Sequence, residues 1–207
     1  MLRNRSGTSV VQSAIDIKRW LQDLPSVEAA RPSRCTACGA ASCLVGGPIA
    51  LHGHGTRERQ VRGPLEPGGA PVLVVIVARR YRCVLCRTVA IVVPRGVQGR
   101  RLYSASAIAF ALALWGLVLA TAAEVRRRVS PAARVGDTAA VGWVTLRRWA
   151  RDVSRRRLFP SVVDPGPSAS LREVAARAAT ALAARADSTT RALASEHRAF
   201  LGAAHGA

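Results

Sequence analysis

Two short stretches, CTACG at residues 35–39 and CVLCR at residues 83–87, decide the fold of the N-terminal half of this 207-residue chain. Each contains a C-x-x-C pair, and a two-residue spacer lets one tight turn direct both thiols at the same ion. Glycine tolerates a positive φ, so Gly39 suits such a turn. Because four thiolates match the tetrahedral preference of Zn²⁺, the sequence predicts one structural zinc held by four ligands: Cys35, Cys38, Cys83 and Cys86.

Other roles for the cysteines and nearby histidines fit the sequence less well. A redox pair of the thioredoxin kind requires a βαβ context, which the sequence does not offer. His52 and His54 would share one face of a strand, so a site that contains histidine is geometrically feasible. Since four thiolates already close a structural site, we expect Cys43 to be a small loop residue and the histidines to be polar or phosphate-facing.

The composition around the cysteine pairs predicts a small β module. Residues 34–94 are rich in glycine, proline and β-branched residues, with a strong strand signal in VLVVIVARRYRC (72–83) and a turn in GPLEPGGAP (63–71). We expect a three-stranded zinc ribbon. Upstream, apolar residues recur near helical spacing over residues 9–22, which predicts one short helix that ends before Pro25.

The second half of the chain is predicted to be helical. Residues 104–157 are rich in alanine and leucine and then in arginine, and the breakers in FPSVVDPGPS (159–168) indicate a linker. Ser170 and Glu173 have the spacing of a capping box, so a last helix should begin at Ser170. Because its apolar residues are mostly alanine, we expect this helix to pack weakly or to form a homodimer.

The charge balance indicates a polyanionic partner. The formal net charge is +19, which favours nucleic acid or an anionic membrane surface. Ten arginines stand against three acidic residues between Thr121 and Arg157. If Gly142–Val153 is a helix, Leu146, Trp149 and Val153 lie on one stripe and the arginines point elsewhere. Such a helix, with a buried face and a basic outer face, suits DNA recognition.

Several segments together resemble the N-terminal zinc-ribbon and helix-turn-helix portion of bacterial insertion-sequence transposases. They also resemble small standalone proteins of unknown function with the same organisation. The likeness covers about residues 30–155. It rests on these segments: CTACG, HGHGTRERQVRG, RRYRCVLCRTVAIVVP, RRLYSASAIAFALAL and VTLRRW.

The resemblance implies that the four cysteines hold zinc and that the helix-turn-helix contacts the ends of a mobile element. The implied contacts on the recognition helix are Trp143, Thr145, Arg147 and Arg148. The outer basic face adds Arg151, and the preceding helix adds three residues near the DNA backbone: Arg126, Arg127 and Arg128. The stretch SPAARVGDTAA is longer than the usual turn into a recognition helix, so the start of that helix is left open.

The nuclease domain of such transposases has no counterpart in this chain. That domain places three carboxylates around two divalent metals. After residue 155 only four acidic residues remain, in a linker and a short helical region: Asp164, Glu173, Asp187 and Glu196. We therefore expect a DNA-binding remnant, accessory subunit or regulator, and not an enzyme.

One alternative comes from another class of protein. Residues 105–123 (ASAIAFALALWGLVLATAA) contain no charge and as a helix would span about 29 Å, enough for a bilayer core. The chain would then be a single-span membrane protein with a cytoplasmic, zinc-bearing basic domain. Eight alanines weaken the apolar character of the segment, and arginines flank both ends, so soluble packing is favoured.

The sequence therefore predicts an α+β protein with a small zinc-ribbon β module, an all-α helix-turn-helix and an outer helix at each end. The expected segments are an N-terminal helix and linker (1–30), the ribbon (31–100), the helix-turn-helix (101–158) and a linker with the C-terminal helix (159–207). No signal-peptide pattern opens the chain. We expect a cytoplasmic, nucleoid-associated protein that binds duplex DNA.

Overall fold

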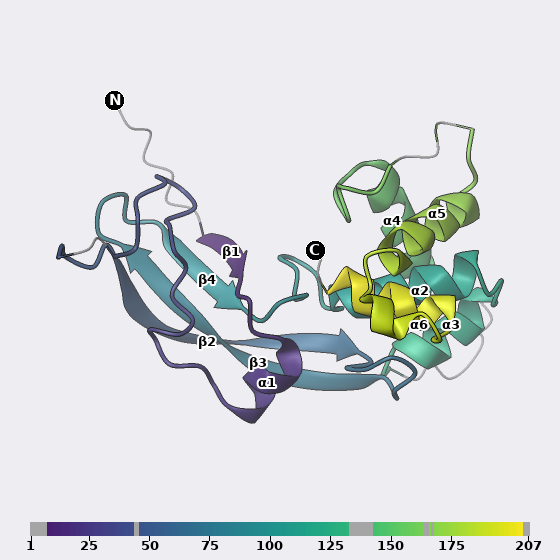
Figure 1. Cartoon of the computed structure of the whole chain (residues 1–207), viewed down its shortest axis with the longest axis horizontal. Coiled ribbons are helices and arrows are strands. Elements are labelled where there is room, and N and C mark those ends of the chain that lie inside the picture. The colour runs from purple at the N-terminus through teal and green to yellow at the C-terminus, as the bar shows by residue number, and fades with distance from the viewer. Residues whose placement is uncertain (1–7, 44–45, 133–142, 164–165, 167, 205–207) are drawn as a thin grey trace. The chain divides into compact units, whose positions relative to one another are not determined.

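The computed structural model describes residues 8–43, 46–132, 143–163, 166 and 168–204. The chain is α+β and divides into two compact units. The first unit comprises Met1–Gln60 and Val75–Arg100, and the second comprises Val61–Val74 and Arg101–Ala207. The strands lie in the purple-to-teal part of the chain and the larger helices in the teal-to-yellow part (Figure 1).

A mixed four-stranded sheet forms the β part of the chain. The order is β1-β4-β3-β2, and the strands are β1 (Thr8–Gln12), β2 (Leu51–Gly63), β3 (Val72–Cys83) and β4 (Val89–Val93). Strand β4 pairs antiparallel with β3 and parallel with β1. Residues 64–71, which connect β2 and β3, are too few for a parallel crossover, so these two strands form an antiparallel hairpin.

The N-terminal segment differs from its prediction. The single helix expected over residues 9–22 is wrong, because Thr8–Gln12 forms strand β1 and only Ile17–Gln22 forms helix α1. Consequently the sheet has four strands where three were expected. The β-branched residues of TSVVQ favour a strand, and Asp16 caps α1 by accepting a hydrogen bond from the Arg19 amide.

The core of the first unit lies on one face of the sheet. Tyr81 and Cys83 of β3 and Val92 of β4 are buried there together with Trp20 and Leu51. The Trp20 indole donates to the Val77 carbonyl oxygen at 3.0 Å, so α1 is fixed to the sheet. Since Trp20 is buried, α1 is part of this core and not an outer helix as predicted.

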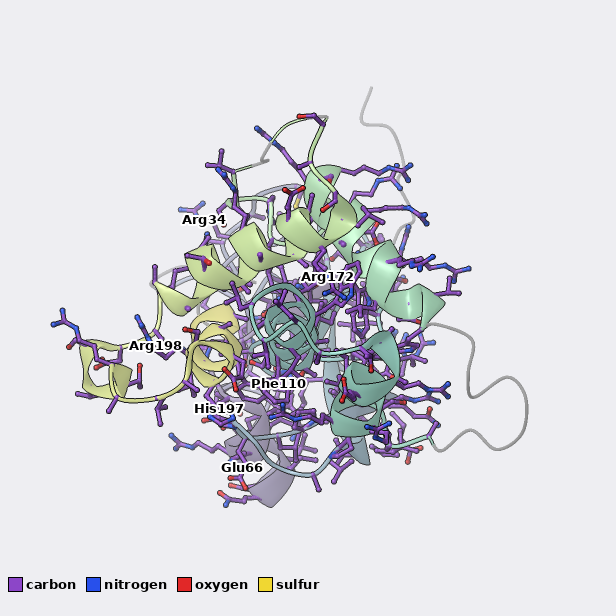
Figure 2. The ribbon with its side chains drawn as sticks, turned by 90° about the vertical axis from the view of Figure 1, so that its right-hand side faces the viewer. Arg34, Glu66, Phe110, Arg172, His197 and Arg198 are labelled. Carbon is purple, nitrogen blue, oxygen red and sulfur yellow. The ribbon has the colours of Figure 1, made fainter. Side chains whose placement is uncertain are left out.

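Helix α2 (Ala105–Gly116) is the central element of the second unit. It is buried on every side from Ala105 to Trp115, as expected for a helix that is apolar all round. Four helices pack against it: α3 (Ala122–Val129), α4 (Val144–Ser154), α5 (Leu171–Ala183) and α6 (Ser195–Ala203). Figure 2 shows Phe110 of α2 among these helices.

The expected long helix over residues 105–123 ends at Gly116. Leu119 has a left-handed backbone (φ 61°), and the Ala120 amide donates to the Leu114 carbonyl at 3.0 Å, which closes the helix end. Thr121 then caps α3 in a capping box with Glu124. Within the described residues no helix is long and apolar enough to cross a membrane. The membrane-spanning alternative depended on that longer helix.

The C-terminal segment is also more closely packed than predicted. The capping box of Ser170 and Glu173 is present and begins α5, but α5 ends at Ala183 and α6 follows a short 3-10 helix, η2 (Ser188–Thr190). Buried alanines on α5 join the same core as α2. A Cβ added at Gly202 of α6 would lie 1.8 Å from the Leu182 carbonyl oxygen. The prediction of a weakly packed outer helix is therefore wrong, because small residues let these helices approach closely.

Candidate functional site

The two C-x-x-C turns have the same backbone geometry. In the first turn the Gly39 amide donates to the Cys35 carbonyl at 2.9 Å, and in the second the Arg87 amide donates to the Cys83 carbonyl at 2.9 Å. The fourth residue after the first cysteine is left-handed in both, with φ 74° at Gly39 and 63° at Arg87. This shared conformation directs both thiols of each pair to one side of the turn.

The turns bring four thiols into one cluster. The Sγ atoms of Cys35 and Cys86 are 3.6 Å apart, those of Cys38 and Cys83 are 3.8 Å apart, and all four lie within 4.8 Å of one another. These distances are much longer than an S–S bond of about 2.05 Å, and all five cysteines are free thiols. The cluster is therefore a group of four ligands that could hold a metal ion.

The strands and the core position this cluster. Cys83 ends β3, and the Cys83 amide donates to the Thr88 carbonyl at 3.1 Å just before β4. Cys35 and Cys83 are buried, whereas Cys86 is half-buried and Cys38 is exposed. The Ser9 and Thr36 hydroxyls lie 2.7 Å apart, which links β1 to the first turn. The site thus has a buried side and a solvent-facing side.

The surroundings of the thiols shift their ionisation in opposite directions. Burial of the Cys86 thiol raises its pKa, but hydrogen bonds from Thr88 and from neighbouring thiols outweigh this and lower the pKa to about 6. At Cys38 the Ala40 backbone lowers the pKa, but loss of solvation and the other three thiols raise it to about 12. Without a metal the cluster therefore retains protons, and a bound cation would displace them.

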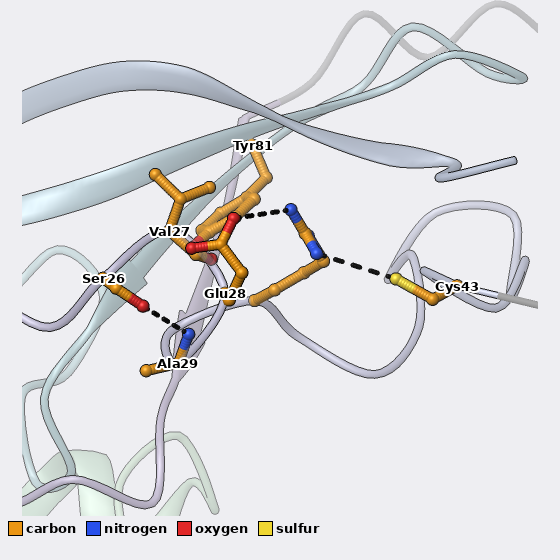
Figure 3. A network of polar contacts seen from close by, with 7 residues as sticks. Ser26, Val27, Glu28, Ala29, Cys43 and Tyr81 are labelled. Carbon is orange, nitrogen blue, oxygen red and sulfur yellow. Dashed lines mark hydrogen bonds and ion pairs between the residues drawn. The ribbon is translucent and has the colours of Figure 1, made fainter.

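Cys43, His52 and His54 lie outside the four-thiol cluster. Cys43 is exposed, and its Sγ accepts a hydrogen bond from Arg31 Nη1 at 3.7 Å. Arg31 also pairs with Glu28 at 3.7 Å. Dashed lines at Glu28 and Cys43 in Figure 3 mark these two contacts. Both histidines lie on the exposed part of β2. Cys43 is thus a loop residue outside the cluster, as expected, and it also contacts an arginine, which was not predicted.

Helix α4 carries four of the eight predicted DNA-contact residues: Thr145, Arg147, Arg148 and Arg151. Leu146, Trp149 and Val153 are buried on its inner side, as the sequence predicted. Arg147, Arg148 and Arg151 are exposed, and among the described residues no ion pair holds any of these three arginines. Thr145 is half-buried. Gly142, which was expected to begin this stripe, lies outside the described residues, and the helix begins at Val144.

The side chains of Trp143 and Arg128 contact aromatic rings of the protein itself. The Trp143 ring lies 5.0 Å from the Trp149 ring and 5.8 Å from the Tyr103 ring, measured between ring centroids. Arg128 of α3 lies over the Phe110 ring at 5.1 Å although it is exposed, as is its neighbour Arg127, whereas Arg126 is half-buried. The predicted residues on α3 and α4 therefore differ in how freely their side chains can meet a ligand.

Sequence reasoning missed the residues that hold α4 in place. Arg101 Nη2 and Asp152 Oδ2 form an ion pair at 3.0 Å, with about a fifth of each side chain exposed. Tyr103 donates to the Ser130 hydroxyl at 2.9 Å while its ring contacts Trp149 at 5.1 Å. The only signal in the sequence was Asp152, an acid within a run of arginines.

No family model matches this chain, and no curated protein or solved structure matches it either.

Proposed function

We propose that this chain is a DNA-binding protein in which the four cysteines hold zinc and α4 lies in the major groove of duplex DNA. The observation that carries the proposal is the division of α4 into a buried apolar side and an exposed side with Arg147, Arg148 and Arg151. The likeness to the N-terminal portion of insertion-sequence transposases supports it. We propose the arrangement of a zinc ribbon followed by a helix-turn-helix of α3 and α4.

The chemistry of the donor set supports zinc. At a Zn–S distance of about 2.3 Å a tetrahedral site places its sulfurs about 3.8 Å apart, and two of the sulfur pairs here are 3.6 and 3.8 Å apart. Four thiolates suit a borderline-soft cation much better than Mg²⁺ or Ca²⁺, which prefer oxygen. Bound zinc would supply folding free energy to the first unit by joining the two turns.

Zinc content tests this part of the proposal. Purified protein should contain one zinc per chain. Cys83→Ser should lose zinc and unfold the β part, because the three remaining thiolates do not complete the tetrahedral coordination of the ion. Cys43→Ser is the matched control: it removes an exposed thiol outside the cluster and should keep the metal. Full zinc content and unchanged stability in Cys83→Ser would show that the four-thiol assignment is wrong.

The charge and size of α4 suit the major groove of DNA. An 11-residue helix is about 16 Å long, and the groove is about 12 Å wide and admits a helix. Residues near the helix start can reach base edges, and arginines are well suited to guanine or phosphate. Two acids of α3 and α4 have partners of their own, since Asp152 pairs with Arg101 and Glu124 caps α3.

Selection from a pool of random duplexes tests DNA recognition. The wild-type chain should enrich a shared sequence, and the Arg147→Ala, Arg148→Ala double variant should not, because it removes the exposed guanidinium groups while leaving Leu146 and Trp149 in place. Thermal melts of both proteins check that the double variant is folded. If the wild-type chain recovers no duplex above background, DNA binding is not its function.

A further inference from the structure

The turn that ends α4 carries three consecutive arginines in a defined conformation. Arg155 is the C-terminal cap residue of the helix, and Arg156 has a left-handed backbone with φ 53°. The Arg157 amide donates to the Asp152 carbonyl at 2.8 Å, and the Arg156 amide donates to the Val153 carbonyl at 2.9 Å. These bonds satisfy the last carbonyls of the helix and fix the course of the chain.

Buried residues that follow the arginines anchor the inner side of the turn. Leu158 and Phe159 are each only 1% exposed and belong to the core around α2. The Val162 amide donates to the Phe159 carbonyl at 2.9 Å, and Arg185 donates to the Ser161 hydroxyl at 2.9 Å. These contacts anchor the backbone that follows the three arginines to the helical core.

The arginines themselves face solvent. Arg155, Arg156 and Arg157 are all exposed, and in the part of the chain that the structure describes no ion pair involves them. The nearest acid in the sequence, Asp152, already pairs with Arg101 at 3.0 Å. Three like charges next to one another repel, and no ion pair among the described residues offsets this repulsion.

The left-handed backbone of Arg156 is a second feature that disfavours the folded state. A left-handed residue after a helix is usually glycine, because a Cβ makes this conformation unfavourable. Residues in such conformations persist where the surroundings hold them, and they are concentrated at functional sites. Glycine at position 156 would fit the same turn without strain, so a glycine variant tests whether the guanidinium group of Arg156 has a role of its own.

We propose that Arg155, Arg156 and Arg157 form a preorganised clamp for the phosphate backbone of duplex DNA, an inference that rests on the proposed function of α4. The helix is about 16 Å long, so its C-terminal end extends beyond a groove about 12 Å wide and meets the backbone at the groove edge. Because the turn is already fixed, binding orders only the arginine side chains, which lowers the entropic cost of association.

Replacement of Arg156 by glycine separates this role from a structural one. Because it relieves the strained backbone, Arg156→Gly should raise the melting temperature by about 2 to 4 °C. The same variant should weaken DNA binding. The slope of log Kobs against log salt should become shallower by about 0.9 for the lost phosphate contact. The weakening should be the same on selected and unrelated duplexes, because phosphates carry no sequence information.

Two further variants identify the group responsible. Arg156→Asn tolerates the left-handed backbone without a charge and should bind like Arg156→Gly, whereas Arg156→Lys keeps the charge and should retain most of the wild-type salt slope. Arg191→Ala is the charge control, because Arg191 is exposed beside η2. In Figure 2, η2 lies at the left edge of the helical unit, away from α3 and α4 at its right edge.

The outcomes separate this proposal from the function on which it rests. If Arg147→Ala, Arg148→Ala weakens binding but Arg156→Gly and Arg156→Asn bind like wild type at every salt concentration, the clamp is absent and α4 remains the DNA-binding element. A lower melting temperature for Arg156→Gly would also overturn the proposal, since Arg156 would then be stabilising the fold. If the wild-type chain binds no duplex at all, the proposed function itself fails.

Discussion

Gly39 and Arg87 occupy equivalent positions in the two cysteine turns, yet only one of them is glycine. Both residues are left-handed and both donate to the carbonyl of the first cysteine of their pair. No atom lies within 4 Å of a Cβ built on Gly39, so the cost of a side chain there is one of backbone conformation and not of crowding.

Substitutions at these two positions should have opposite effects on the zinc-loaded protein. Arg87→Gly should raise the free energy of unfolding by about 1 kcal/mol, since the left-handed conformation costs a residue with a Cβ about 1–2 kcal/mol. Gly39→Val should lower it by at least as much, because valine is β-branched. Denaturant melts of both variants and wild type measure these changes. An equal loss of stability in both would contradict the equivalence of the two turns.

At the scale of elements, helix caps were the most predictable feature. Ser170 and Glu173 form the expected capping box at the start of α5, and Thr121 and Glu124 form a second one at the start of α3. Both depend on residues three positions apart, so they can be identified from sequence. Strand β1 could not be identified in this way, because it depends on pairing with β4, about 80 residues later in the chain.

The two capping carboxylates should make the helical unit sensitive to acid. The Thr121 and Ser170 backbone amides and hydroxyls lower the pKa values of Glu124 and Glu173 below their usual value near 4.5. A carboxyl whose pKa is lowered by folding stabilises the folded state above the unfolded pKa, and this contribution is lost as the pH falls through the folded pKa. Stability should therefore decrease below about pH 4.5.

A double variant, Glu124→Gln with Glu173→Gln, isolates this effect because glutamine can accept the same hydrogen bonds without titrating. Thermal melts followed by helical circular dichroism between pH 7 and pH 3 should show a smaller fall in melting temperature for the double variant than for wild type. Parallel curves for the two proteins would mean that the caps do not couple helix stability to pH.

The buried stripe of α4 was also predictable, but the residues outside the helix that hold it in place were not. Leu146, Trp149 and Val153 follow from helical spacing within one segment. The pair of Arg101 and Asp152 joins residues far apart in sequence, and many arginines compete for the same acid, so spacing alone cannot select the partner. The same limit applies to Tyr103, whose partners Ser130 and Trp149 lie on two different segments.

At the scale of the whole molecule, the apolar segment 105–116 shows how context decides structure. Its lack of charge suits either a bilayer or a protein interior. In the structure it is the buried helix around which α3, α4, α5 and α6 pack, and the alanines of α5 complete that core. The sequence predicted the four-thiol cluster, because C-x-x-C spacing is local chemistry, but the assembly of the helical core depends on contacts between distant segments.

The two units should respond differently to loss of metal. Chelation should remove amide protection from β3 and β4, where Cys83 and Tyr81 lie in the core next to the thiols. Amides of α2 should keep their protection, because that helix is buried in a core that contains none of the cysteines. Hydrogen exchange with and without chelator measures both. Equal loss of protection in β4 and α2 would show that the units unfold together.

The most direct test of the central claim is a salt titration of duplex binding by wild type and by the Arg147→Ala, Arg148→Ala double variant, with Arg191→Ala as the charge control. We predict that the double variant binds more weakly at every salt concentration, with a slope shallower by about 0.9 for each arginine that contacts a phosphate, and that the control stays close to wild type. If the double variant binds like wild type throughout, α4 is not the DNA-binding element and the proposed function is contradicted.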